Sequence, residues 1–178
     1  MRPLLAGLAL AALMTAPAFA ALQPGAAAPD FTAQASLGGK VFSFSLAEAL
    51  KQGPVVLYFY PEAFTTGCTM EAHDFASHID DYRKLGATVI GVSGDPIDKL
   101  QRFSVSECRG KFAVAADPDQ SIMKAYDSIL ARKPELADRT SYVIAPDGTI
   151  IESYTELKPD HHVENTLAAV KEWASHKH

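Results

Sequence analysis

The sequence PVVLYFYPEAFTTGC occupies residues 54–68, and it decides which fold the chain can adopt. Its first half, Pro54 to Tyr60, is a continuous run of apolar residues, mostly β-branched or aromatic. Such a run is typical of a strand buried on both faces of a sheet. From Cys68 onward, apolar residues recur every three or four positions, which predicts an amphipathic helix. Cys68 is therefore expected in the first turn of a helix that follows a central strand.

The first turn of a helix favours the nucleophilic form of a cysteine. Its backbone N–H groups have no acceptor inside the helix, and they lie at the positive end of the helix dipole. Both effects stabilise a thiolate relative to a thiol. Cys68 is thus a candidate nucleophile.

Strands and helices alternate along the rest of the chain. Gly38-Gly39 predicts a hairpin turn, and Pro146-Asp147-Gly148 predicts a second one. Further strands are expected at 87–92, 112–116, 140–145 and 149–154, and further helices after Ser45, Asp95, Asp119 and Pro159-Asp160. This order predicts one α/β domain with a central mixed β-sheet flanked by helices.

The helix after the second central strand leads to the second cysteine. Asp95-Pro96 predicts its start, with aspartate as the cap and proline at the first helical position. Its expected apolar stripe is Ile97, Leu100, Phe103 and Val105. Cys108 falls near the end of this helix.

Residues 1–20 have the pattern of a secretory signal peptide. Arg2 precedes an apolar stretch, and Ala18-Phe19-Ala20 forms a cleavage site with small residues at both ends. We expect cleavage after Ala20, a mature domain of residues 21–178 and a periplasmic location. An uncleaved membrane anchor is the alternative, although the apolar stretch is short for a membrane span.

Charge and cysteine content restrict the possible functions. The net charge is −5, which gives no basis for binding nucleic acid or an anionic membrane surface. The chain has two cysteines, and an oxidising compartment would allow them to form a structural disulfide. A domain of this length does not need such a bond to fold, so we favour a pair that cycles between redox states.

The run Pro61-x-x-x-Thr65-x-x-Cys68 resembles the active-site loop of peroxiredoxins, and the surrounding residues are similar to the bacterioferritin comigratory protein (Q-type) group of the AhpC/TSA family. The resemblance covers roughly residues 22–174 and implies a thioredoxin-like fold. It also implies a thiol-dependent peroxidase that acts on hydrogen peroxide or small organic hydroperoxides without metal, haem or flavin. Its electrons would come from a thioredoxin-like or small-molecule thiol, and we expect a monomer.

The resemblance assigns roles to four residues. Cys68 is the peroxidatic cysteine, and Arg139 lies beside its thiolate and stabilises charge in the transition state. Thr65 offers a hydroxyl that can donate to and accept from the peroxide. Pro61 shapes the pocket wall without adding an N–H group. The simpler alternatives are a surface arginine, a threonine bonded to its own turn, and a proline that merely ends the strand.

The sequence departs from the Q-type pattern where the sulfenic acid of Cys68 must be reduced. Many members carry a resolving cysteine five residues after the peroxidatic one, but this chain has His73 there, and Thr66 stands where proline is common. Other members resolve from the next helix, so Cys108 is the candidate partner. The alternatives are a one-cysteine enzyme that uses an external thiol, and a non-catalytic domain with a structural Cys68–Cys108 disulfide.

The remaining polar candidates carry weaker signals. His73 and His78 are expected on the surface, and His161-His162 at a helix start has no cysteine or carboxylate pattern typical of a metal site. Glu71 either bonds near the active loop or only favours the helix start. A disulfide oxidoreductase or copper chaperone would use C-x-x-C or C-x-x-x-C, and the chain has neither motif.

Overall fold

The central sheet of the protein is mixed, as the sequence predicts. A computed structural model describes residues 21–176, so the predicted signal peptide lies outside the described residues. Within that range, seven strands form one sheet in the order β2-β1-β5-β4-β3-β6-β7. Strand β3 (Val55–Phe59) is parallel to β4 (Thr88–Ser93) and antiparallel to β6 (Thr140–Ile144).

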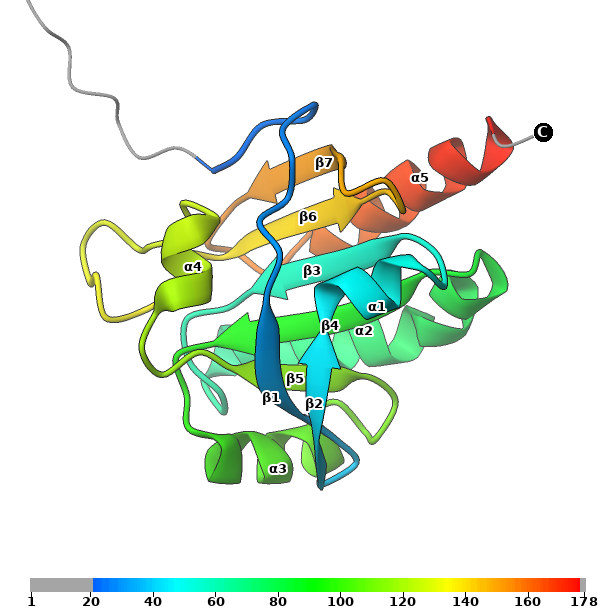
Figure 1. Cartoon of the computed structure of the whole chain (residues 1–178). Helices are drawn as coiled ribbons and strands as arrows, with labels where there is room; N and C mark the ends of the chain where they lie inside the picture. The colour runs from blue at the N-terminus through cyan, green and yellow to red at the C-terminus, as the bar shows by residue number, and fades with distance from the viewer. Residues whose placement is uncertain (1–20, 177–178) are drawn as a thin grey trace, which may run out of the picture.

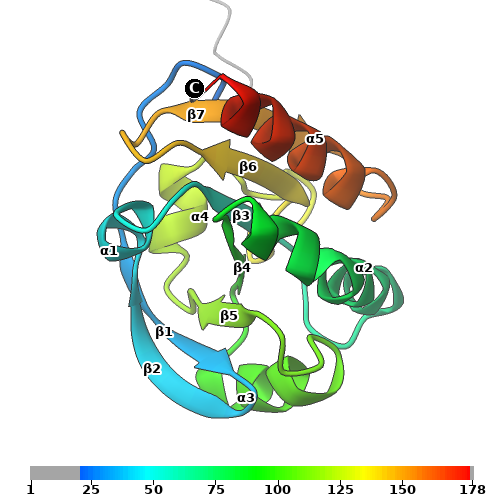
Figure 2. The same ribbon diagram turned by 90° about the vertical axis from the view of Figure 1, so that its right-hand side faces the viewer.

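The other elements complete two layers around this sheet. Helices α2 and α5 cover one face, whereas α1 and α4 lie on the other (Figures 1 and 2). Helix α3 packs mainly on β1 and β5, toward one edge of the sheet. Their bounds are β1 Thr32–Leu37, β2 Lys40–Ser45, α1 Leu46–Leu50, α2 Thr66–Lys84, α3 Ile97–Ser106, β5 Ala113–Ala116, α4 Ser121–Ala125, β7 Ile150–Thr155 and α5 His162–Ser175.

The hydrophobic core has two parts, one on each face of the sheet. Every residue of β3 is buried, which confirms the predicted central strand. Side chains alternate along it: Tyr58 faces α2 and α3, whereas Leu57 and Phe59 face α1 and α4. Cys68 and Cys108 both belong to the part under α2, α3 and α5. The sheet therefore places the two cysteines in the same layer.

Most of the predicted boundaries are confirmed. Gly38 and Gly39 both have positive φ, 55° and 81°, as the hairpin turn between β1 and β2 requires. The Ser45 hydroxyl accepts a hydrogen bond from the N–H of Glu48 at the start of α1. Helix α5 begins two residues after the predicted Pro159-Asp160 start, because His161 adopts a left-handed conformation with a φ of 69°.

Two predictions for α3 were wrong. Val105 is 55% exposed and lies outside the core, because two residues on a helix are about 200° apart and Phe103 already faces inward. Asp95 does not cap α3: Pro96 takes the N-cap position, and no side chain caps the helix there. The carboxylate of Asp95 instead accepts hydrogen bonds from Ala63 and Ser93.

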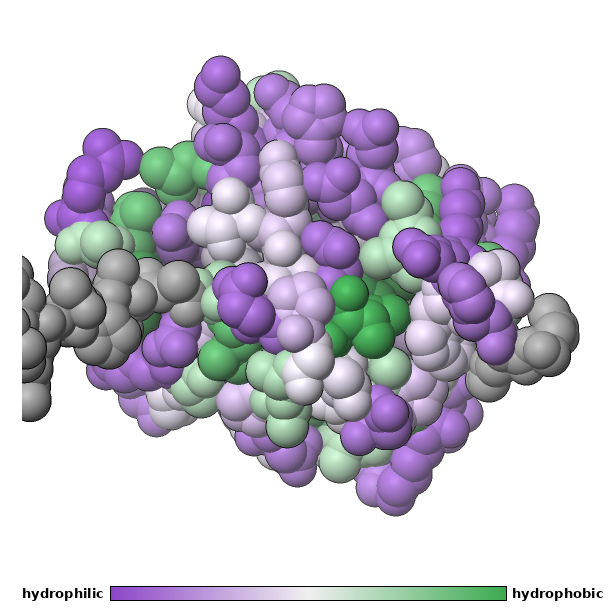
Figure 3. Space-filling view, turned by 90° about the horizontal axis from the view of Figure 1, so that it is seen from above, coloured by the Kyte–Doolittle hydropathy of each residue, from purple (hydrophilic) through white to green (hydrophobic). Residues whose placement is uncertain are grey.

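Among residues 21–176, no helix is both long and apolar enough to cross a membrane. Figure 3 shows the face above β7 and α5, where hydrophilic side chains dominate and hydrophobic ones form small separate areas. Phe64, in the loop before α2, is an exposed aromatic side chain.

Candidate active site

The loop after β3 delivers Cys68 to the start of α2, as predicted. Thr65 is the N-cap, and its carbonyl accepts the first helical hydrogen bond, from Thr69. Cys68 is the third residue of the helix, so its N–H has no acceptor within the helix. The side chain is only 1% exposed. The sulfur is therefore almost completely shielded from solvent in this conformation.

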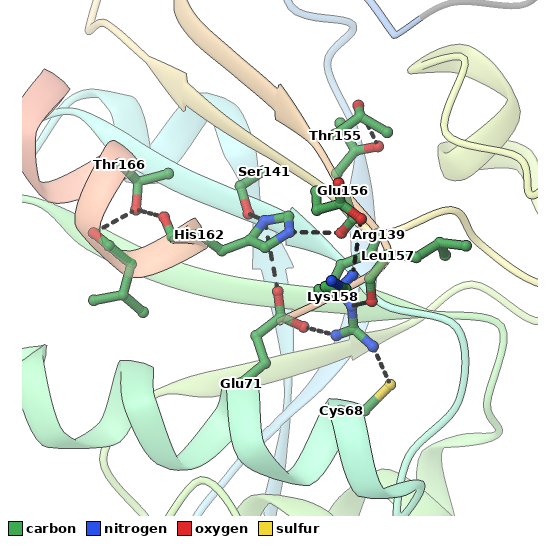
Figure 4. A network of polar contacts seen from close by, with 12 residues as sticks. Cys68, Glu71, Arg139, Ser141, Thr155, Glu156, Leu157, Lys158, His162 and Thr166 are labelled. Carbon is green, nitrogen blue, oxygen red and sulfur yellow. Dashed lines mark hydrogen bonds and ion pairs between the residues drawn. The ribbon is translucent and has the colours of Figure 1, made fainter. Parts of the chain in front are cut away.

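Arg139 contacts Cys68 directly. It comes just before β6, whose first residue, Thr140, pairs with Phe59 at the end of β3, and this register places Arg139 beside the loop that carries Cys68. Its Nη2 lies 3.4 Å from the Cys68 Sγ, and its Nε donates to the Leu157 carbonyl at 2.9 Å (Figure 4). Arg139 is 4% exposed, so the alternative of a surface arginine is wrong.

Glu71 holds the other side of the guanidinium group. Its Oε2 accepts a hydrogen bond from Arg139 Nη1, and the Glu71 side chain is fully buried. Burial raises the pKa of Glu71 to about 8, although the charge of Arg139 opposes this shift. Of the two alternatives for Glu71, the bond near the active loop is confirmed. Glu71 fixes the orientation of Arg139 toward the sulfur.

His162 extends this network, which sequence reasoning missed. Its Nε2 lies 2.9 Å from the Glu156 carbonyl, which can only accept, so Nε2 carries a proton. Its Nδ1 lies 2.8 Å from the Ser141 hydroxyl and 3.7 Å from Glu71 Oε1 (Figure 4). Burial and the nearby charge of Arg139 lower the pKa of His162 to about 4. His162 is therefore neutral at pH 7, and Nδ1 accepts from Ser141.

Thr65 and Pro61 lie in the same loop but differ in exposure. Thr65 is exposed, and its hydroxyl donates to the Glu62 carbonyl at 2.8 Å. The predicted bond to its own turn is thus confirmed, and the oxygen of Thr65 still has lone pairs free to accept. Pro61 is half-buried at the end of β3. Both residues are close to Cys68 in the sequence, whereas Arg139, just before β6, is the residue whose side chain contacts the sulfur.

Comparisons with known proteins agree with this geometry. The model of the AhpC/TSA family matches residues 24–153. The chain belongs to this family. It is 32% identical to the putative peroxiredoxin bcp of Helicobacter pylori over 84% of this chain and 98% of that protein, and 33% identical to the chloroplastic peroxiredoxin Q of Populus jackii over 84% and 68%. The crystal structure of peroxidoxin BcpB from Mycobacterium tuberculosis matches with a TM-score of 0.76 and 27% identity, covering 85% of this chain and 97% of that chain.

The protein is thus a peroxiredoxin of the Bcp or Q type with a thioredoxin-like fold. The residues matched by the family model include both parts of the site, the loop 61–68 and Arg139. In the described part of the chain, no group of three or more histidines, cysteines and acidic residues is arranged to hold a metal ion.

The second cysteine of this peroxiredoxin is buried just after α3. Cys108 and Cys68 are both free thiols. The exposed fraction is 0% for Cys108 and 1% for Cys68. Burial, with a smaller effect from Glu107, raises the pKa of the Cys108 thiol. Tyr58 and Tyr60 pack in the same cluster as the two cysteines. Cys108 is therefore unreactive in this conformation.

Gly67 offers a test of the arginine position in this peroxiredoxin. A Cβ atom at Gly67 would lie 3.1 Å from Arg139 Nη2, so alanine would push the guanidinium group by a few tenths of an ångström. We expect Gly67→Ala to slow the reaction of Cys68 with hydrogen peroxide by about three- to tenfold. The melting temperature should not fall, because alanine favours a helix over glycine. A wild-type rate in this variant, measured by rapid quench, would show that the site tolerates the displacement.

Proposed function

We propose that the protein reduces hydrogen peroxide and small organic hydroperoxides through a sulfenic acid on Cys68. The Cys68 thiolate attacks one peroxide oxygen, the O–O bond breaks, and the leaving oxygen takes a proton and departs as water or an alcohol. Cys68 is oxidised and the peroxide is reduced by two electrons. The observation that carries this proposal is the 3.4 Å contact between Arg139 Nη2 and the Cys68 Sγ at a helix N-terminus.

Each residue of the site has a defined part in this reaction. Arg139 stabilises the thiolate and the negative charge that develops on the departing oxygen. Thr65 accepts a hydrogen bond from the peroxide, because its own proton is directed to the Glu62 carbonyl. Pro61 limits access of water without presenting an N–H group. Glu71 keeps Arg139 in place.

Cys108 is the proposed resolving residue. Its thiolate would attack the Cys68 sulfenic acid, form a disulfide and release water, and a thioredoxin-like dithiol would then reduce the disulfide. Two observations require a conformational change first: Cys108 is buried, and its thiol pKa is raised. The segment that carries Cys108 must therefore leave its pocket. A one-cysteine cycle with an external thiol is the alternative. A non-catalytic domain with a structural Cys68–Cys108 disulfide does not explain why Arg139 lies beside the Cys68 sulfur.

A contact between His73 and Glu107 holds the Cys108 segment in its buried position against α2. His73 Nε2 on α2 lies 2.8 Å from Glu107 Oε2, and Glu107 directly precedes Cys108. A partly exposed pair of this kind contributes about 0–1 kcal/mol. We expect His73→Ala to speed disulfide formation after the sulfenic acid by up to about fivefold, because less energy is needed to open the segment. The rate is measured by stopped flow after one equivalent of peroxide.

The matched control is His78→Ala. His78 lies on the same helix and pairs with Asp74 at 3.2 Å, but this pair does not involve the segment of Cys108. Its disulfide rate should equal that of the wild type. If His73→Ala forms the disulfide at the wild-type rate or more slowly, the His73–Glu107 pair does not retain Cys108.

We also propose that the protein acts in the periplasm, as a monomer, after removal of residues 1–20. The signal-peptide pattern of the sequence supports the periplasmic location and the cleavage. Expression of the full chain in a bacterium, followed by fractionation and intact mass, tests this directly. A periplasmic protein that begins at Ala21 is expected, and a full-length protein retained in the cytoplasm would contradict the proposal.

A further inference from the structure

Asp95 is a buried carboxylate that the chemistry of Cys68 does not use directly. It lies between β4 and α3 and is 8% exposed. Its Oδ2 accepts hydrogen bonds from the Ala63 N–H at 2.7 Å and from the Ser93 hydroxyl at 2.9 Å. Ala63 belongs to the peroxidatic loop, residues 61–68, and is 32 positions away in the sequence. Asp95 therefore holds this loop against the end of β4.

Lys99 joins the same contact from the first turn of α3. Its Nζ lies 2.7 Å from Asp95 Oδ1 and 2.9 Å from Glu62 Oε1. Lys99 neutralises the buried carboxylate, which would otherwise be costly to desolvate. It also ties a second residue of the peroxidatic loop, Glu62, to α3. The loop is thus held at two adjacent positions.

The contacts at Glu62 and Ala63 fix the orientation of the Thr65 side chain. The Glu62 carbonyl accepts both the hydroxyl of Thr65, at 2.8 Å, and its N–H, at 3.4 Å. Between Glu62 and Thr65, Phe64 adopts a φ of 70°. This left-handed conformation is unfavourable for a bulky residue and persists only where the surroundings impose it. Its ring packs edge-on against Phe103 of α3, with centroids 5.2 Å apart. Loss of the Asp95 contact would therefore favour a shift of Phe64 and its neighbours to a less strained backbone conformation.

We propose that Asp95 is a positioning residue of the peroxidase site. Its carboxylate fixes Ala63 and, through Glu62, the direction of the Thr65 hydroxyl, so that peroxide is held in line with the Cys68 sulfur. The inference rests on the proposed peroxidase function. It concerns peroxide alignment rather than thiolate formation, because Arg139 and the helix N-terminus stabilise the sulfur independently of Asp95.

The test compares two reagents on proteins that also carry Cys108→Ser. Hydrogen peroxide needs the aligned loop, whereas iodoacetamide needs only an accessible thiolate. We expect Asp95→Ala to lower the peroxide rate constant at least about tenfold, while the iodoacetamide rate constant stays within about threefold. Asp95→Asn should lower the peroxide rate at least about threefold, because its oxygen can still accept from Ala63 but its amide group faces the Lys99 ammonium group without a charge to pair with it. The matched control is Asp98→Ala, an exposed aspartate in the first turn of α3.

Each result separates the positioning role from the alternatives. A peroxide rate in Asp95→Ala equal to that of the control would overturn the inference. So would a peroxide rate that falls while the iodoacetamide rate rises, because that pattern indicates general loosening of the fold. Should Asp95→Ala not fold, Asp95→Asn decides by the same two criteria. If the Cys108→Ser parent does not react with peroxide, the proposed function fails rather than the role of Asp95.

Discussion

Replacement of Arg139 by methionine is expected to slow the reaction of Cys68 with hydrogen peroxide by about 10²–10³-fold. The guanidinium group lies 3.4 Å from the sulfur and is almost fully buried. Its positive charge therefore acts on the sulfur with little screening by water, and methionine offers no charge in its place. The rate constant is measured in a Cys108→Ser background, so that only the first step is observed. Arg132→Met, which changes an exposed arginine of the preceding loop, is the control and should react at the wild-type rate.

The same substitution should also destabilise the protein. Arg139→Met leaves the buried Glu71 carboxyl without its hydrogen-bond donor, and an unsatisfied buried polar group costs about 1–3 kcal/mol. The double variant Glu71→Leu/Arg139→Met removes both partners and should recover most of the free energy of unfolding. It should not recover the peroxide rate. If the double variant regains activity together with stability, Arg139 acts through the fold and not through the sulfur.

Acidification from pH 6.5 to pH 4 is expected to remove about 3 kcal/mol of stability through His162 alone. Its ordinary pKa of 6.5 falls to about 4 in the folded protein, mainly because the ring is buried. A group with a depressed pKa contributes stability that is complete above 6.5 and is lost as the pH falls through 4. Glu71 acts with the opposite sign: its pKa rises from 4.5 to about 8, so its contribution is complete below 4.5 and is lost as the pH rises through 8.

Urea unfolding at a series of pH values isolates the contribution of His162. His162→Gln removes the titrating group, so the difference in unfolding free energy between wild type and variant should shrink by about 3 kcal/mol between pH 6.5 and pH 4. His161→Gln is the matched control, since the neighbouring ring is exposed and pairs with Glu164. A constant difference between wild type and His162→Gln across this range would show that the buried ring does not titrate as described.

Local sequence patterns predict the layers of this fold and the position of the candidate nucleophile, Cys68, well. The strand at β3 follows from seven apolar residues in a row, and the place of Cys68 follows from the helix that begins beside it. Arg139 required the resemblance to peroxiredoxins, because nothing in its neighbours indicates that it faces inward. Once β6 pairs with β3, the position of Arg139 beside Cys68 is a consequence of register.

The residues that sequence reasoning missed depend on contacts between distant segments. His161 and His162 are adjacent residues of the same type, yet one is exposed and the other is fully buried beside Glu71. The pattern Asp95-Pro96 is typical of a helix cap, but the carboxylate finds a better donor in the Ala63 N–H of another loop. A spacing signal was available for His162, since it precedes Thr166 by four residues, and both face the core.

A two-cysteine peroxidase cycle changes the mass of the protein in a characteristic way. The reduced mature protein is treated with one equivalent of hydrogen peroxide, and its intact mass is read within seconds, beside Cys68→Ser and Cys108→Ser variants. We predict a rapid loss of two hydrogens that requires both cysteines, and a gain of one oxygen at Cys68 in Cys108→Ser. An unchanged mass in the wild type would rule out a rapid reaction of Cys68 with hydrogen peroxide. An oxygen gained at Cys68 whether or not Cys108 is present would indicate a one-cysteine cycle.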